Sequence, residues 1–287
     1  MTANNLTRRQ MLAGLTTAGL AFGVTRIKAA APGFKLGVCD WQINKRSDPS
    51  ALAVARDIGL DGVMVDIGGL KNDLHLRRPE VQQSYRDAVR QTGVVVSSLA
   101  LGLLNEYPLK NDPRAERWVA DSIDVCKAMR LKVVLVPFFG NGDLKGDQAG
   151  TDAVVAAFNR LAPKAADAGV TMGIESWLSA EQHVEILERV GSPAVRVYYD
   201  MGNSQYAGWD VGKEIRFLGK RICEFHAKDY DGLFGKGSMN FPAVRAAMDD
   251  IGYRGWIQIE GVKRTLGVEE SVRYDLNYLR GIFPRTV

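Results

Sequence analysis

Residues 170–260 contain four short apolar runs that each end on a titratable residue: VTMGIE (170–175), VRVYYD (195–200), ICEFH (222–226) and WIQIE (256–260). Each run has the length and the content of branched and aromatic residues that are typical of a buried β-strand. A charged group at the end of a buried strand costs free energy unless another group pairs with it. The four ends, Glu175, Asp200, His226 and Glu260, would converge on one point if these strands were neighbours in a parallel sheet.

The same succession of strand, loop and helix repeats along most of the chain. Eight strands are predicted, at residues 35–39, 62–67, 94–99, 132–138, 170–175, 195–200, 222–227 and 256–260. Helices are predicted at residues 51–58, 79–92, 114–129, 152–168, 180–190, 211–218, 242–251 and 271–282. Apolar strands that alternate with helices indicate a parallel sheet, and eight such units favour a closed (β/α)8 TIM barrel of class α/β. We therefore expect a single-domain barrel over residues 34–287.

Residues 1–31 are predicted to be a twin-arginine export signal. Arg8 and Arg9 precede a mildly apolar run at 12–24, and small residues follow at 29–31. The run is too short and too rich in Gly and Thr to form a stable membrane span. These features predict a periplasmic protein; the alternative is a cytosolic amphipathic tail in which the arginine pair arose by chance.

The composition restricts the kinds of partner and chemistry. The net charge of +4 comes partly from the N-terminal segment, and the remaining charges nearly balance, so nothing indicates a nucleic acid as partner. Cys39, Cys126 and Cys223 lie within apolar runs and are predicted to be buried core residues. A catalytic thiol is the weaker alternative, because no histidine lies near Cys39 or Cys126 in the sequence, although His226 follows Cys223 by three residues.

The four strand-end residues form a mostly oxygen-donor set that suits a divalent metal ion. Any one of them alone is explained equally well by a helix cap or by a pair with a lysine. Their presence at the ends of four consecutive strands favours a metal site formed by Glu175, Asp200, His226 and Glu260. Because there is no thiolate and only one imidazole, Mn²⁺, Mg²⁺ or Co²⁺ is expected ahead of Zn²⁺.

Several short motifs resemble a known family. The sequences YDMGN (199–203), HAKD (226–229), GLDGV (59–63) and GKGSMNF (235–241), together with Glu175 and Glu260, resemble the xylose-isomerase-like TIM barrel superfamily. Within that superfamily, the sugar phosphate isomerase/epimerase branch is the most similar. The resemblance extends from about residue 34 to the end of the chain. It implies a small-molecule carbohydrate as substrate, and a homodimer is a family-level expectation.

The resemblance also implies a mechanism on a free sugar or keto sugar. The metal would polarise the carbonyl, and Glu175 or Glu260 would remove the neighbouring proton, while Asp200 and His226 would serve mainly as ligands. The enediolate would be stabilised by the metal, and the other glutamate would return a proton in an epimerase. The alternative is a lyase or dehydratase that uses the same site on a 3-keto glycoside or inosose.

Three polar residues are candidates for substrate binding. Lys228 could hold a substrate oxygen, or it could form a salt bridge with Asp229 or Asp200. Asn203 could bind a hydroxyl or cap the helix after the sixth strand. Glu181 corresponds to a glutamate that contacts sugar in related epimerases, although a favourable charge at a helix N-terminus explains it as well.

Aromatic residues that follow the strands could form the wall of a sugar pocket. Trp41, Trp177 and Phe139 are the candidates, and core packing is the alternative for each of them. Asp66, at the end of the second strand, could bind the substrate or a lysine in the pocket.

Two further functions are disfavoured. A DNA repair endonuclease shares this barrel, but its zinc site needs more histidines than the three in this chain. A non-catalytic sugar-binding subunit would have no need to bury four titratable groups at one point.

Overall fold

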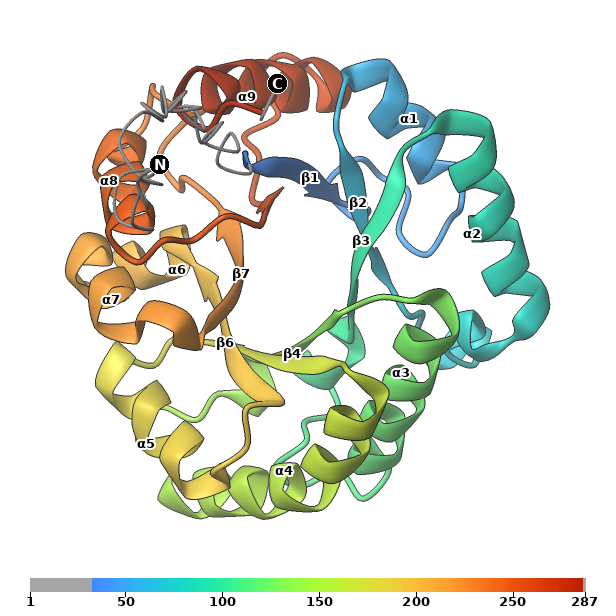
Figure 1. Cartoon of the computed structure of the whole chain (residues 1–287), viewed down its shortest axis with the longest axis vertical. Coiled ribbons are helices and arrows are strands. Elements are labelled where there is room, and N and C mark those ends of the chain that lie inside the picture. Colours follow the sequence, from blue (N-terminus) through green and yellow to red (C-terminus); the bar gives the residue numbers. More distant parts are fainter. Residues whose placement is uncertain (1–32, 286–287) are drawn as a thin grey trace, which may run out of the picture. The chain divides into compact units, whose positions relative to one another are not determined.

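The computed structural model describes residues 33–285 and contains a closed barrel of eight parallel strands in sequence order (Figure 1). The strands are β1 (Lys35–Cys39), β2 (Gly62–Asp66), β3 (Val95–Ala100), β4 (Val133–Phe138), β5 (Thr171–Ser176), β6 (Val195–Asp200), β7 (Ile222–Ala227) and β8 (Trp256–Ile259). The barrel closes through pairing of β1 with β8, in which Leu36 lies opposite Ile257. The predicted TIM barrel fold is confirmed.

Helices surround the strand barrel in Figure 1 and cover its outer face. They are α1 (Ala51–Ile58), α2 (Pro79–Thr92), α3 (Ala115–Met129), α4 (Gln148–Ala168), α5 (Ala180–Val190), α6 (Met201–Tyr206), α7 (Val211–Leu218), α8 (Phe241–Asp250) and α9 (Val268–Ile282). Short 3-10 turns lie in the loops: η1 (Leu70–Asn72), η2 (His75–Arg77), η3 (Gly102–Asn105), η4 (Gly140–Gly142) and η5 (Gly219–Arg221). None of the helices within residues 33–285 is long and apolar enough to cross a membrane. The predicted export signal at 1–31 lies outside the described residues.

The helix boundaries depart most from the prediction at α4, α6 and α9; α9 begins at Val268, three residues before the predicted start at 271, without a side-chain cap. Helix α4 begins at Gln148, four residues before the predicted start at 152, because the Asp147 side chain accepts a hydrogen bond from the Gly150 amide. Helix α6 was not among the predicted helices. It begins directly after Asp200, whose side chain accepts a hydrogen bond from the Asn203 amide. A side chain that accepts from the free amides of a first turn stabilises that turn.

Successive side chains of a strand point alternately toward the helices and into the barrel, and in β7 this places apolar and polar side chains on opposite faces. In β7, Phe225 packs in the main core between strands and helices, whereas Glu224 and His226 face the inside of the barrel with Cys39 and Tyr198. Lys228 follows two residues after His226. The carboxyl end of the barrel therefore receives an alternating series of polar groups from β7, and this is the end at which the predicted site lies.

Candidate metal centre

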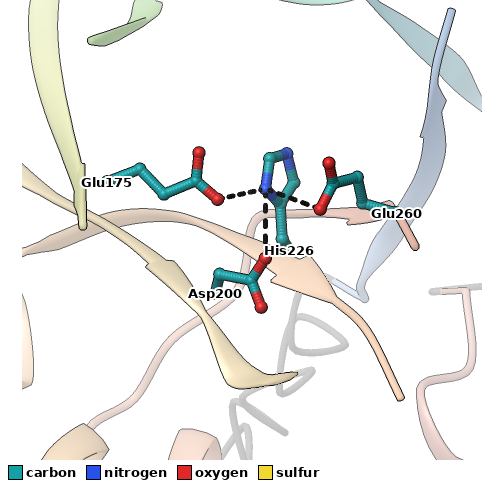
Figure 2. Close-up of side chains that lie close together, drawn as sticks. All are labelled: Glu175, Asp200, His226 and Glu260. Carbon is teal, nitrogen blue, oxygen red and sulfur yellow. Dashed lines mark hydrogen bonds and ion pairs between the residues drawn. The ribbon is translucent and has the colours of Figure 1, made fainter. Parts of the chain in front are cut away.

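The four predicted metal ligands meet above the carboxyl end of the barrel (Figure 2). Each offers one ligand atom, and these atoms all lie within 4.8 Å of one another. His226 Nδ1 lies 2.9 Å from Glu175 Oε1, 3.7 Å from Asp200 Oδ2 and 3.9 Å from Glu260 Oε2. Figure 2 shows Glu175 and Glu260 approaching the His226 ring from opposite sides. The two glutamates therefore lie on opposite sides of one small volume.

Glu175, Asp200 and His226 are buried together in this volume, and their pKa values are strongly shifted. Burial raises the pKa of Glu175 to about 7, although His226 acts in the opposite direction. Burial also disfavours ionisation of Asp200, but the Lys228 ammonium, His226 and the Asn203 amide together outweigh it and lower the pKa of Asp200 below its usual range. Burial opposes the charged form of His226 too, yet the nearby Glu175 and Asp200 carboxylates raise the pKa of the imidazole well above its usual value. A divalent cation at Nδ1 must displace that proton.

The arrangement of the oxygens fits a cation. Asp200 Oδ2 and Glu260 Oε2 are both buried, and no residue within 33–285 gives either of them a well-directed hydrogen bond. Lys228 Nζ lies 2.9 Å from Asp200 Oδ2 and also contacts Glu260 Oε2. These contacts supply one positive charge but leave the lone pairs of both oxygens available. Three carboxylates and one imidazole are a donor set suited to a hard or borderline divalent cation.

Lys228 and Asn203 lie beside the four ligand residues. Lys228 forms the salt bridge with Asp200 that the sequence predicted as one alternative, and its Nζ lies 3.2 Å from Asn203 Oδ1. The same Asn203 oxygen accepts a hydrogen bond of 2.6 Å from the Tyr230 hydroxyl. Asp200, not Asn203, caps helix α6. Both Lys228 and Asn203 line the cavity in front of the ligand residues.

That cavity, which we call the reaction pocket, has a volume of about 240 Å³. Trp41, Phe139 and Trp177 contribute to its wall, and Trp177 packs edge-on against Phe139 with ring centroids 5.3 Å apart. Trp41 Nε1 donates a hydrogen bond of 3.2 Å to Glu260 Oε1. Trp41 therefore both forms part of the wall and orients one of the candidate ligands.

Glu181 does not take part in the reaction pocket. It is exposed in the first turn of α5, and it is not among the residues that line the pocket. This position agrees with a favourable charge at a helix N-terminus, which was the alternative to sugar contact.

Cys39 is buried as predicted. No histidine lies near it in the sequence, but one lies beside it in the folded chain. Its Sγ lies 3.4 Å from His226 Nε2, across 187 residues of chain. Burial raises the pKa of the Cys39 thiol to about 12, so it is a neutral neighbour of the imidazole and not a nucleophile.

Three further residues of the pocket were not identified from the sequence: Arg46, Asn105 and Tyr230. All three lie in loops that follow strands, at the end where barrel enzymes place their active sites. That position was the available signal, but loop residues show no periodicity that separates a pocket side from a solvent side.

Comparison with known proteins places the chain in a family. A family model described as a xylose isomerase-like TIM barrel matches residues 52–282. The chain belongs to the xylose isomerase-like TIM barrel family. The family resemblance predicted from the motifs around Glu175, Asp200, His226 and Glu260 is thereby confirmed.

Two relatives that are similar in sequence carry the names of epimerases. The 2-epi-5-epi-valiolone 7-phosphate 2-epimerase of Actinoplanes sp. is 28% identical over 178 residues, which cover 61% of this chain and 65% of that protein. This chain thus spans slightly less than two thirds of that relative. A putative L-ribulose-5-phosphate 3-epimerase of Escherichia coli is 25% identical over 260 residues, covering 79% of this chain and 88% of the relative.

Solved structures of the xylose isomerase-like family share this barrel. One is the D-psicose 3-epimerase of Clostridium cellulolyticum, with a TM-score of 0.74 and 15% identity, covering 87% of this chain and 99% of that one. At this identity, the similarity supports the fold alone.

Proposed function

We propose that this protein is a divalent-metal-dependent epimerase or isomerase of a free keto sugar. The observation that carries the proposal is the convergence of Glu175, Asp200, His226 and Glu260, with two buried carboxylate oxygens that lack a well-directed hydrogen bond within the described part of the chain. The names of the two sequence relatives, both epimerases, support the same reaction class.

The proposed reaction moves one proton at the carbon beside a carbonyl. The chemistry that a divalent cation would supply, held by Glu175, Asp200, His226 and Glu260, is polarisation of that carbonyl. One glutamate takes the proton as the C–H bond breaks, and the other donates a proton to the same carbon from the opposite side. Their approach from opposite sides in Figure 2 supports this division of roles. No oxidant or reductant is needed, because a proton is removed and a proton is returned.

Other residues of the pocket would bind and orient the sugar. The Lys228 ammonium faces the pocket and can donate to a sugar oxygen that becomes negatively charged during proton removal. Trp41, Phe139 and Trp177 provide aromatic surface for the C–H faces of the ring. The Tyr230 hydroxyl holds the Asn203 side-chain oxygen, so the Asn203 amide nitrogen remains available to bind the sugar.

An unphosphorylated substrate and a periplasmic location belong to the same proposal. Both rest on the export signal predicted at 1–31, which lies outside the described residues. The two relatives are named for phosphorylated substrates, so a panel of candidate substrates has to contain both forms.

Proton NMR in D₂O tests the proposal directly. The protein is loaded with Mg²⁺, which unlike Mn²⁺ does not broaden the signals, and is given free ketohexoses, 3-keto glycosides and the matching sugar phosphates. We expect deuterium to enter the carbon beside the carbonyl together with a new epimer or isomer, and EDTA should stop both processes. Loss of a leaving group with an unsaturated product would instead establish the lyase alternative. Absence of exchange with every sugar, despite metal binding, would refute the proposal.

Replacing Trp41 with Phe should lower kcat/KM about tenfold, because it removes the hydrogen bond to Glu260 Oε1 but keeps an aromatic wall. The measurement is the initial rate of deuterium entry with the best sugar of the panel. Trp256→Phe is the matched control, because Trp256 lies at the first residue of β8, at the opposite end of the barrel. Equal losses in the two variants would show that Trp41 does not orient Glu260.

A further inference from the structure

A second cavity adjoins the reaction pocket and has no role in the mechanism above. It has a volume of about 600 Å³ and lies among the loops that follow β1, β2 and β3. Four residues line both cavities: Arg46, Asp66, Gly102 and Asn105. We call it the side cavity. The two cavities therefore adjoin each other at these residues.

The boundary between the cavities is a fixed ion pair. Asp66, 2% exposed, holds Arg46 Nη1 at 3.4 Å, and the guanidinium also lies over the Trp41 ring, 5.3 Å from its centroid. Gly102 makes room for this pair: a Cβ atom there would fall 2.6 Å from Asp66 Oδ2 and 3.1 Å from Arg46 Nη1. The other Arg46 nitrogens form no hydrogen bond or ion pair with residues 33–285, so their N–H groups can bind a ligand at the boundary.

The side cavity also has free polar groups and apolar surface. Asn105 Oδ1 is buried and has no hydrogen-bond partner among residues 33–285. Lys71 is exposed, and none of the ion pairs in that range involves it. Leu70 is 42% exposed and lines the same cavity. A site that offers hydrogen bonds beside apolar surface matches a ring that carries both hydroxyl groups and C–H faces.

The charges along the side cavity favour a neutral ligand. Arg46 and Lys71 contribute two positive groups, and Asp66 and Glu106 contribute two carboxylates. A seat for a phosphate or carboxylate would present an excess of cations. The equal numbers of positive and negative groups therefore favour a neutral sugar ring over an anionic substituent in the side cavity.

The geometry points to the side cavity as a seat for a second sugar ring, so that the substrate is a keto sugar joined by a glycosidic bond to another sugar. The assignment rests on the proposed function for the reaction pocket and specifies its substrate class. The reacting ring occupies the reaction pocket, and Arg46 and Asn105 lie where the two rings join.

Gly69 offers a way to fill the side cavity without disturbing the reaction pocket. It lines only the side cavity, its backbone is extended with φ −130° and ψ −173°, and a Cβ atom there meets nothing within 4 Å. Gly69→Leu should therefore fold normally and occupy space that the second ring needs. Gly281→Leu is the matched control, because Gly281 also has open space at Cβ and lies in α9.

The experiment compares matched pairs of keto sugars: 3-keto-D-glucose with 3-keto-cellobiose, and D-fructose with maltulose. We expect the wild-type protein to catalyse deuterium entry into at least one disaccharide with a higher kcat/KM than into the matching monosaccharide. Gly69→Leu should reduce that preference about tenfold, which corresponds to the loss of one or two hydrogen bonds. Gly281→Leu should retain it. Saturation-transfer NMR provides a readout independent of turnover: protons of the second ring should receive saturation from the wild type and lose it in Gly69→Leu.

The outcomes separate this inference from the proposed function. Equal rates for both members of each pair, or equal losses for both in Gly69→Leu, would overturn the second-ring seat and leave the epimerase intact. If the protein prefers a sugar phosphate and inorganic phosphate abolishes that preference, the side cavity binds an anionic group and not a neutral ring. Absence of deuterium exchange with every sugar would refute the proposed reaction. Saturation transfer alone would then test whether the side cavity binds a second ring, and absence of saturation transfer to that ring would overturn the inference. If Gly69→Leu does not fold, Lys71→Ala provides the same comparison at an exposed position.

Discussion

Glu175→Gln should slow both deuterium entry and epimer formation by about 10²- to 10⁴-fold, the usual contribution of a general acid or base. Glutamine keeps the size of the side chain and one carbonyl oxygen that can still approach a cation, but it cannot accept a proton. Burial raises the pKa of Glu175 to about 7, so near neutral pH the native side chain can either take up or release a proton. The measurement is initial-rate NMR in D₂O together with the metal content of each variant.

The metal content separates proton transfer from metal binding. If excess Mn²⁺ restores exchange in Glu175→Gln, measured as deuterium content by mass spectrometry, then Glu175 acts only as a ligand and the proposed role as a base is wrong. Glu188→Gln is the control on the same side of the barrel. Glu188 is exposed on α5, so its replacement should change the rate by less than about twofold, as is usual for a surface substitution.

Lys228→Met should lower the free energy of unfolding of the metal-free protein by about 3 kcal/mol, the lower end of the cost of breaking a buried ion pair. Lys228 is 8% exposed, and its ammonium lies 2.9 Å from Asp200 Oδ2 while it also contacts Glu260. Methionine retains the length of the side chain but removes the ammonium charge from both carboxylates. Urea unfolding in EDTA measures the loss.

Addition of Mn²⁺ should then stabilise Lys228→Met more than it stabilises the wild type, because the metal provides the positive charge that the lysine no longer supplies. The control is Lys164→Met, which breaks a pair with Asp124 whose side chains are 41% and 61% exposed, respectively. An exposed pair contributes less than about 1 kcal/mol, so this variant should be nearly as stable as the wild type. An equal response to Mn²⁺ in Lys228→Met and the wild type would show that the lysine and the metal do not act on the same carboxylates.

Local patterns were sufficient to predict the strands and most of the helices. The eight predicted strands agree with β1–β8 within one residue at each end, because apolar runs with turn residues between them are a local signal. The glycines that precede several strands mark helix ends reliably, as at Gly59 and Gly169, both of which have positive φ. The start of α4 and all of α6, which were less well predicted, depend on the side-chain caps of Asp147 and Asp200, whereas the start of α9, three residues earlier than predicted, has no such cap.

The set of four candidate ligands was predictable because parallel strands in a barrel all end on the same side. Knowing that Glu175, Asp200, His226 and Glu260 end successive strands is enough to bring them together. The orientation of His226 was not predictable. Only the folded chain shows that Nδ1 faces the carboxylates while Nε2 faces the thiol of Cys39, a residue 187 positions away.

The sequence by itself determined the order of strands and helices, the identity of the four convergent residues and the family, because each is carried by spacing along the chain. Tertiary structure alone decided which charges balance one another and where a ligand has room. Lys228 could have paired with either of two aspartates, and it pairs with Asp200 because β6 and β7 are neighbours. The side cavity exists because three separate loops meet around Arg46 and Gly102. Loop positions are set by long-range packing, which leaves no periodic pattern in the sequence.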